Sequence, residues 1–134
     1  MAAKILFVCI GNSCRSQMSE GFAKKHGGDS VEVWSAGSRP CGYVNSQAIA
    51  FMKEKGIDIS SHTSKGLSQV PKVNWDYVVT MGCGDICPYV ASQSMEDWGI
   101  SDPVGRPDSE FRMVRDIIED KVIALMKRVK GNAR

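Results

Sequence analysis

The chain has 134 residues, of which 43% are hydrophobic and 24% charged, and its formal net charge is +2. A chain of this length and composition is expected to form one folded domain over residues 1–134. The small net charge gives no basis for nucleic acid or a membrane surface as a partner. The apolar run at 5–10 is too short for a signal segment or a membrane span, so we expect a cytoplasmic protein.

Strands and helices are expected to alternate along the chain. Short β-rich runs predict strands at 4–8, 31–35, 76–81 and 94–98, and helices are expected at 15–26 and 46–55. A last helix begins near Asp108 or Ser109, either of which can cap it, and continues to about Lys130. Its apolar residues from Phe111 to Val129 recur at spacings of three and four. This alternation predicts an α/β fold with a parallel sheet.

The five cysteines are Cys9, Cys14, Cys41, Cys83 and Cys87. An odd number without a secretory signal indicates reduced thiols rather than a disulfide framework. Cys83 and Cys87 are separated by three residues, with no second close pair or histidine nearby, so we expect no zinc site and no other metal.

The segment between the first strand and the first helix reads Cys-Ile-Gly-Asn-Ser-Cys-Arg-Ser over residues 9–16. A tight loop at this place can turn its backbone N–H groups toward a bound anion, and the helix N-terminus adds positive potential. Arg15 offers a planar fork for two oxygens of a tetrahedral anion. We call residues 9–15 the oxyanion loop. Its expected anion-binding residues, together with the adjoining serine, are Ile10, Gly11, Asn12, Ser13, Cys14 and Ser16.

Cys9 is the candidate nucleophile in this loop. A helix N-terminus and a nearby cation favour the thiolate, and Ser13 or Ser16 could hydrogen-bond it. The alternative is a buried thiol at a strand end, but strand, Gly, Asn, Ser, Arg and helix in this order favour a catalytic site. Cys14 is either a packing residue or an oxidation partner for Cys9. Ligands of parallel α/β folds bind beyond the carboxyl ends of the strands, where Cys9 and the segment 81–87 are both expected.

The run from Cys9 to Glu20 resembles the signature of the low-molecular-weight tyrosine phosphatase fold, and more narrowly that of the thioredoxin-coupled arsenate reductases built on it. The similarity covers nearly the whole chain and includes the segments 35–37, 56–60, 62–64, 78–80, 97–99, Asp102-Pro103 and 111–116. It implies a three-layer, flavodoxin-like fold in which helices flank a sheet of four parallel strands.

The resemblance also implies a reaction, the reduction of arsenate to arsenite, with phosphate and sulfate as analogues and no cofactor. Cys9 would attack arsenate while Arg15 and the loop amides hold its oxygens, and Asp102 would protonate the departing oxygen. Cys83 and Cys87 match the two further cysteines that pass the resulting disulfide to thioredoxin or a related thiol reductant. They lie closer together than in the best-known reductases, which leaves the order of disulfide exchange open.

Two other functions remain. A low-molecular-weight phosphatase needs only Cys9, Arg15 and Asp102, but the segment 104–106 lacks the aromatic residues that usually grip a phosphotyrosine ring. The other alternative is a non-catalytic module that binds oxyanions or senses redox state.

Some family members hold potassium through residues that match Asn12, Glu20 and Ser35 plus an acid. This chain has Lys65 where the acid is expected, so we expect no potassium site, and the Lys65 ammonium is a candidate for the vacated position.

Overall fold

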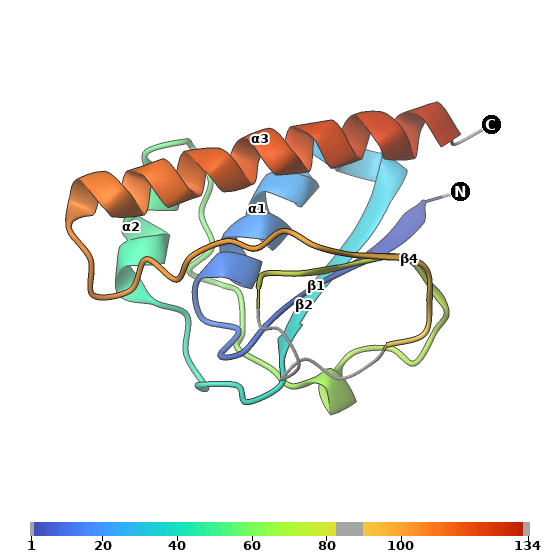
Figure 1. Ribbon diagram of the computed structural model, residues 1–134, viewed down its shortest axis with the longest axis horizontal. Coiled ribbons are helices and arrows are strands. Elements are labelled where there is room, and N and C mark those ends of the chain that lie inside the picture. The colour runs from blue at the N-terminus through green and yellow to red at the C-terminus, as the bar shows by residue number, and fades with distance from the viewer. Residues whose placement is uncertain (1, 83–89, 133–134) are drawn as a thin grey trace.

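The structure is a computed structural model that describes residues 2–82 and 90–132 (Figure 1). Its centre is a sheet of four strands in the order β2-β1-β3-β4. All paired neighbours are parallel. The strands are β1 (Ala3–Cys9), β2 (Val31–Gly37), β3 (Trp75–Thr80) and β4 (Ser92–Asp97). This arrangement confirms the predicted α/β class and the flavodoxin-like sheet.

Three α-helices cover one face of the sheet: α1 (Arg15–Gly27), α2 (Ser46–Lys53) and α3 (Asp108–Asn132). Figure 1 shows α3 running along the outside of this layer, with α1 between it and the strands. Phe7, Met18, Phe22, Ile118 and Leu125 are fully buried between these elements. Burying a side chain of this size contributes about 1.5–3 kcal/mol, so this face supplies most of the core.

The opposite face of the sheet carries a second, smaller core. It is covered by the short 3₁₀ helix η2 (Leu67–Gln69) and the coil around it. Trp34 and Trp75 meet edge to face there, with ring centroids 5.5 Å apart. Within the described residues, this third layer is therefore one helical turn with its flanking coil.

Several predicted boundaries differ from the observed ones by one or two residues, and three of these differences are described here. β3 ends at Thr80: the Met81 N–H still bonds to the Val8 carbonyl of β1, but the Met81 carbonyl accepts a hydrogen bond from Arg15. Asp108 is the first helical residue of α3 instead of its cap, since the N–H groups of residues 110 and 111 bond to the Pro107 carbonyl. α2 ends at Lys53, and the turn that follows includes Gly56 with a φ of 76°.

The carboxyl ends of β1 and β3 lie side by side, because β1 pairs with β3 up to Val8↔Thr80. Strand order reverses at β1, which is where parallel α/β folds bind ligands. The oxyanion loop follows β1 directly and leads into α1. Within residues 2–82 and 90–132, no helix combines the length and apolarity that crossing a membrane requires.

Candidate active site

The carbonyl groups of the oxyanion loop are all held by donors on its outer side. The carbonyls of residues 9, 10, 11 and 13 accept the backbone N–H groups of Ser38, Arg39, Cys41 and Asn45 at 2.8–3.3 Å. The Asn12 carbonyl accepts the Gln17 side chain at 3.1 Å, and the Cys14 carbonyl accepts an N–H of α1. Because successive carbonyls point outward, the intervening N–H groups are turned toward the inside of the loop.

These inward N–H groups border a cavity of about 310 Å³. Within the described part of the chain, no protein acceptor bonds to an N–H group of residues 10–14. The cavity is lined by six of the loop residues, Arg15 among them, and by Arg39, Cys41, Tyr43, Asn45, Asp102 and Val104. Unpartnered N–H groups beside an arginine and a helix N-terminus form a binding site for a tetrahedral anion.

Asn12 and Gly11 shape the loop in different ways. Asn12 has a φ of 48°, a left-handed backbone conformation that asparagine adopts more readily than most residues. Gly11 contributes space for a neighbouring side chain. A Cβ at this position would lie 2.8 Å from Cys41 Sγ, closer than a side chain can approach.

Gly37 sets the distance between β2 and the loop. A Cβ there would lie 2.5 Å from the Ile10 carbonyl oxygen and 3.0 Å from the Asn12 nitrogen, both backbone atoms. We therefore expect Gly37→Ala to displace the loop and to lower kcat/KM for the oxyanion substrate about 100-fold, since misplacement of about 1 Å has this effect. Gly66→Ala is the matched control. Gly66 bridges to Gly37, but its nearest contact would be 3.5 Å away. Equal activity in both variants would contradict the prediction.

The Cys9 side chain ends β1 and is 2% exposed, facing the cavity. Its sulfur lies 2.8 Å from Ser16 Oγ. Of the two serines proposed from the sequence, Ser16 is therefore the one that contacts it. Asn12 Nδ2 donates to the same Ser16 oxygen at 2.8 Å, which holds the hydroxyl in place.

Cys14 also lines the cavity but is a different kind of thiol. Burial raises its pKa far above the ordinary value, and the nearby Asp102 and Cys9 charges raise it further. Cys14 is therefore protonated at neutral pH, and a protonated thiol is a poor nucleophile. This favours the packing role for Cys14 over attack on Cys9.

Arg15 is anchored through one end of its guanidinium. Nη1 donates to the carbonyls of Met81 and Ile100, each at 2.9 Å. These carbonyls follow β3 and β4, so the anchor fixes the guanidinium relative to the sheet. Within residues 2–82 and 90–132, Nε and Nη2 have no protein partner, and they remain available for two oxygens of a bound anion.

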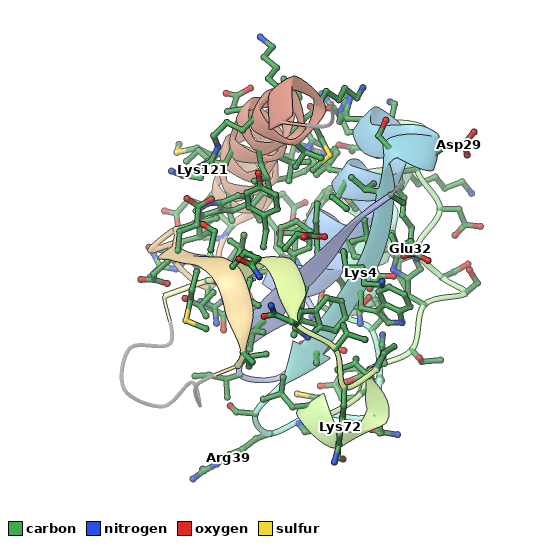
Figure 2. All side chains as sticks on the ribbon, turned by 90° about the vertical axis from the view of Figure 1, so that its right-hand side faces the viewer. Lys4, Asp29, Glu32, Arg39, Lys72 and Lys121 are labelled. Atoms are coloured by element: carbon green, nitrogen blue, oxygen red, sulfur yellow. The ribbon has the colours of Figure 1, made fainter. Side chains whose placement is uncertain are left out.

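The rim of the cavity joins residues that are distant in sequence. Asp102 is exposed there, and its Oδ1 accepts the Val104 N–H at 3.1 Å. Tyr43 is 63% exposed on the same rim. Sequence reasoning looked for an aromatic residue only after Asp102 and missed Tyr43. Arg39 extends away from the body of the protein (Figure 2).

The other cysteines differ in what the structure describes. Cys41 is exposed at the cavity rim. Cys83 and Cys87 lie outside the described residues, so their proposed roles rest on the sequence. The described chain before them ends at Gly82, next to the Met81 carbonyl that holds Arg15.

A buried carboxylate lies behind the loop. Glu20 is 4% exposed, accepts the Ser35 hydroxyl and the Lys24 ammonium at 2.5 Å each, and lies 3.9 Å from Lys65 Nζ. Burial alone would raise the pKa of Glu20, but the hydrogen bonds from Lys24 and Ser35 outweigh it and hold that pKa below its usual range. Two ammonium groups thus balance the buried charge, one of them from Lys65.

Comparison with known proteins places this geometry in a family. Residues 4–134 match the model for "Low molecular weight phosphotyrosine protein phosphatase". Arsenate reductase 2 of Staphylococcus epidermidis is 48% identical over 128 residues, which cover 92% of this chain and 96% of the relative.

Two solved structures extend the comparison. An arsenate reductase in the phosphate binding state has a TM-score of 0.87 and 40% identity, covering 95% of this chain and 98% of its own. The thioredoxin-dependent arsenate reductase of Corynebacterium glutamicum has a TM-score of 0.78 and 30% identity, covering 96% of this chain and 62% of its own. With the matching sheet and oxyanion loop, these findings show that the chain belongs to the low-molecular-weight phosphotyrosine protein phosphatase family.

Proposed function

We propose that this chain is a cytoplasmic arsenate reductase in which Cys9 attacks arsenate held by the oxyanion loop. The observation that carries the proposal is the loop itself, whose carbonyls are anchored outward while its N–H groups and Arg15 border one cavity with Cys9. Arsenate as the substrate is supported by relatives that are named arsenate reductases at 48% identity. A similar structure in a phosphate binding state supports a tetrahedral oxyanion as the ligand.

The first step joins sulfur to arsenic. The loop N–H groups and the free edge of Arg15 hold the arsenate oxygens, and the Cys9 thiolate attacks the arsenic atom. One arsenic–oxygen bond breaks, and Asp102, on the rim of the same cavity, gives its proton to the departing oxygen, which leaves as water. Cys9 then carries a covalent thioarsenate.

The second step transfers two electrons to arsenic. A second thiolate, from Cys83 or Cys87, attacks the Cys9 sulfur, and the sulfur–arsenic bond breaks with its electron pair left on arsenic. Arsenate is thereby reduced to arsenite while Cys9 becomes half of a disulfide. The remaining cysteine of the pair attacks that disulfide and frees Cys9. A Cys83–Cys87 disulfide then passes to thioredoxin or a related thiol reductant.

The test is arsenite production by the purified chain with thioredoxin, thioredoxin reductase and NADPH. We expect steady turnover in the parent and loss of turnover in Cys83→Ser and in Cys87→Ser, because each lacks one thiol of the relay. Mass spectrometry after one arsenate turnover without reductant should find the Cys83–Cys87 disulfide in the parent. Detection of a Cys9–Cys14 disulfide alone would contradict the relay.

A phosphatase is the second candidate, and Tyr43 is the observation that favours it. Its exposed ring stands on the cavity rim, where it could contact the aryl group of a phosphomonoester. A phosphatase predicts that both serine variants keep full hydrolysis of p-nitrophenyl phosphate and that the parent reduces no arsenate. A binding or sensing module predicts sulfate or phosphate binding with neither reaction.

A further inference from the structure

Arg39 carries a charge at the rim of the oxyanion cavity that no carboxylate neutralises. It lines the cavity, it is exposed, and its side chain extends into solvent (Figure 2). Four other arginines each pair with a carboxylate, namely Arg106, Arg112, Arg115 and Arg128. Within residues 2–82 and 90–132, Arg39 makes no ion pair, so its charge acts on the mouth of the cavity.

The backbone of Arg39 is fixed against the oxyanion loop. Its N–H donates to the Ile10 carbonyl at 2.9 Å, and the N–H of Cys41, two residues on, donates to the Gly11 carbonyl at 2.9 Å. Pro40 lies between them and restricts the Arg39 backbone to extended conformations. The point from which the side chain extends is therefore set by the loop itself, and the charge stays at the mouth although the guanidinium moves in solvent.

The cavity lining contains few charges. Only Arg15, Arg39 and Asp102 among its residues are ionisable to a full charge by an arginine or a carboxylate. When Asp102 is ionised, its negative charge cancels that of Arg15, and Arg39 then leaves the lining net positive. The proposed reaction adds a Cys9 thiolate and an anion to the same space, so this one cation opposes the repulsion between them.

Charge and shape are recognised by different groups in this cavity. The loop N–H groups and the free edge of Arg15 form hydrogen bonds whose geometry suits four oxygens around one atom, whatever the charge of the anion. Coulomb attraction to a cation at the rim is proportional to the charge of the anion. A rim cation therefore distinguishes between tetrahedral anions of the same shape that differ in charge.

We propose that Arg39 is a specificity-determining residue that makes the cavity favour doubly charged tetrahedral anions over singly charged ones. It acts through its charge and not through a fixed hydrogen bond, because its side chain extends into solvent (Figure 2). The inference rests on one part of the proposed function, the binding of a tetrahedral oxyanion in this cavity. It deepens that function by naming the arsenate dianion as the form that the cavity selects.

The test compares sulfate with perchlorate, which are both tetrahedral but carry two charges and one charge. A bound anion should shield Cys9 from iodoacetamide, and mass spectrometry of the Cys9 peptide over a range of anion concentrations gives each affinity. Sodium chloride keeps the ionic strength constant. We expect Arg39→Gln to weaken sulfate binding about tenfold and perchlorate binding about threefold, because the divalent ion loses twice the interaction energy. Both effects should shrink at higher ionic strength.

Two further variants separate charge from other effects. Arg39→Lys keeps the charge and loses the planar fork, so it should bind both anions within about twofold of the parent. Lys121→Gln removes the same amount of charge from the exposed side of α3, away from the cavity and far from Arg39 in Figure 2, and should match the parent.

Several outcomes would overturn the proposal. Parental affinities in a folded Arg39→Gln, or an equal loss for both anions, would mean that Arg39 does not select by charge. A loss in Arg39→Lys as large as that in Arg39→Gln would replace the charge with a specific contact. Lack of protection by either anion in the parent would contradict the oxyanion site and the proposal with it. Because no arsenate is present, a chain that fails to reduce arsenate can still show the charge preference.

Discussion

Cys9→Ser should reduce arsenate turnover to the level of the protein-free blank. A serine hydroxyl stays protonated at neutral pH and cannot form the sulfur–arsenic bond or the disulfide that carries the two electrons. The substitution is close in shape, and Ser16 Oγ, 2.8 Å from the present sulfur, can bond to the new hydroxyl. We therefore expect the fold and anion binding to survive. Arsenite release measures turnover, and phosphate binding by calorimetry measures the intact loop.

Cys41→Ser is the matched control for this experiment. Cys41 stands on the rim of the same cavity, but it is exposed and has no assigned step in the reaction. Its serine variant should keep turnover within about twofold of the parent, the range expected for a surface substitution. Turnover by Cys9→Ser above the blank, or an equal loss of turnover in Cys41→Ser, would contradict the role of Cys9 as the nucleophile.

Arg15→Lys should lower kcat/KM for arsenate about 1,000-fold. The proposed mechanism gives the guanidinium two tasks, since Nη1 holds the Met81 and Ile100 carbonyls and leaves Nε and Nη2 available for the anion. A lysine ammonium is a single point charge and cannot replace both groups. Loss of one preorganised donor to a developing charge lowers rates about 100- to 1,000-fold, and the lost anchor adds to that effect. Steady-state arsenite release gives kcat/KM for the variant, and phosphate affinity shows separately how well it binds an anion.

The control for charge and side-chain length is Arg112→Lys. Arg112 pairs with Glu54 at 2.9 Å on the exposed side of α2 and α3 and does not line the cavity. We expect unchanged kinetics in this variant, because an exposed ion pair contributes little and lies far from the reaction. Near-parental activity of Arg15→Lys would mean that positive charge alone is enough and that the fork geometry has no role.

The chemistry of the loop could be predicted because it depends on neighbours in sequence. Cys9, Asn12 and Arg15 fall within seven residues between a β-rich run and a helix, so local backbone geometry brings them together. The buried face of α3 could also be predicted from its apolar residues at spacings of three and four. Phe111, Ile118, Val122 and Leu125 are all buried. The edge strand was harder to delimit. β4 begins two residues before its predicted start, and most of its side chains are exposed, so its sequence carries no hydrophobic run.

The polar face of α1 was the main feature that sequence patterns did not indicate. Ser16, Gln17, Ser19 and Glu20 are all buried, although the polar face of a helix usually points to solvent. Their burial depends on partners from other segments, such as Thr63 and His62 for Gln17 and Ser35 for Glu20. The approach of these segments is set by the packing of the sheet and loops, which a pattern within one helix does not encode.

The sequence by itself indicated the candidate nucleophile and the kind of ligand expected beside it, because strand, loop and helix are adjacent in the chain and their geometry is local. Only the tertiary structure decided how that atom is supported. The carbonyls that anchor Arg15 come from positions 66 and 85 residues away, and the buried Gln17 amide is held by His62, 45 residues away. Such long-range bonds form only after the sheet has assembled and water has been excluded from its surroundings. The spacing of residues along the chain therefore does not predict them.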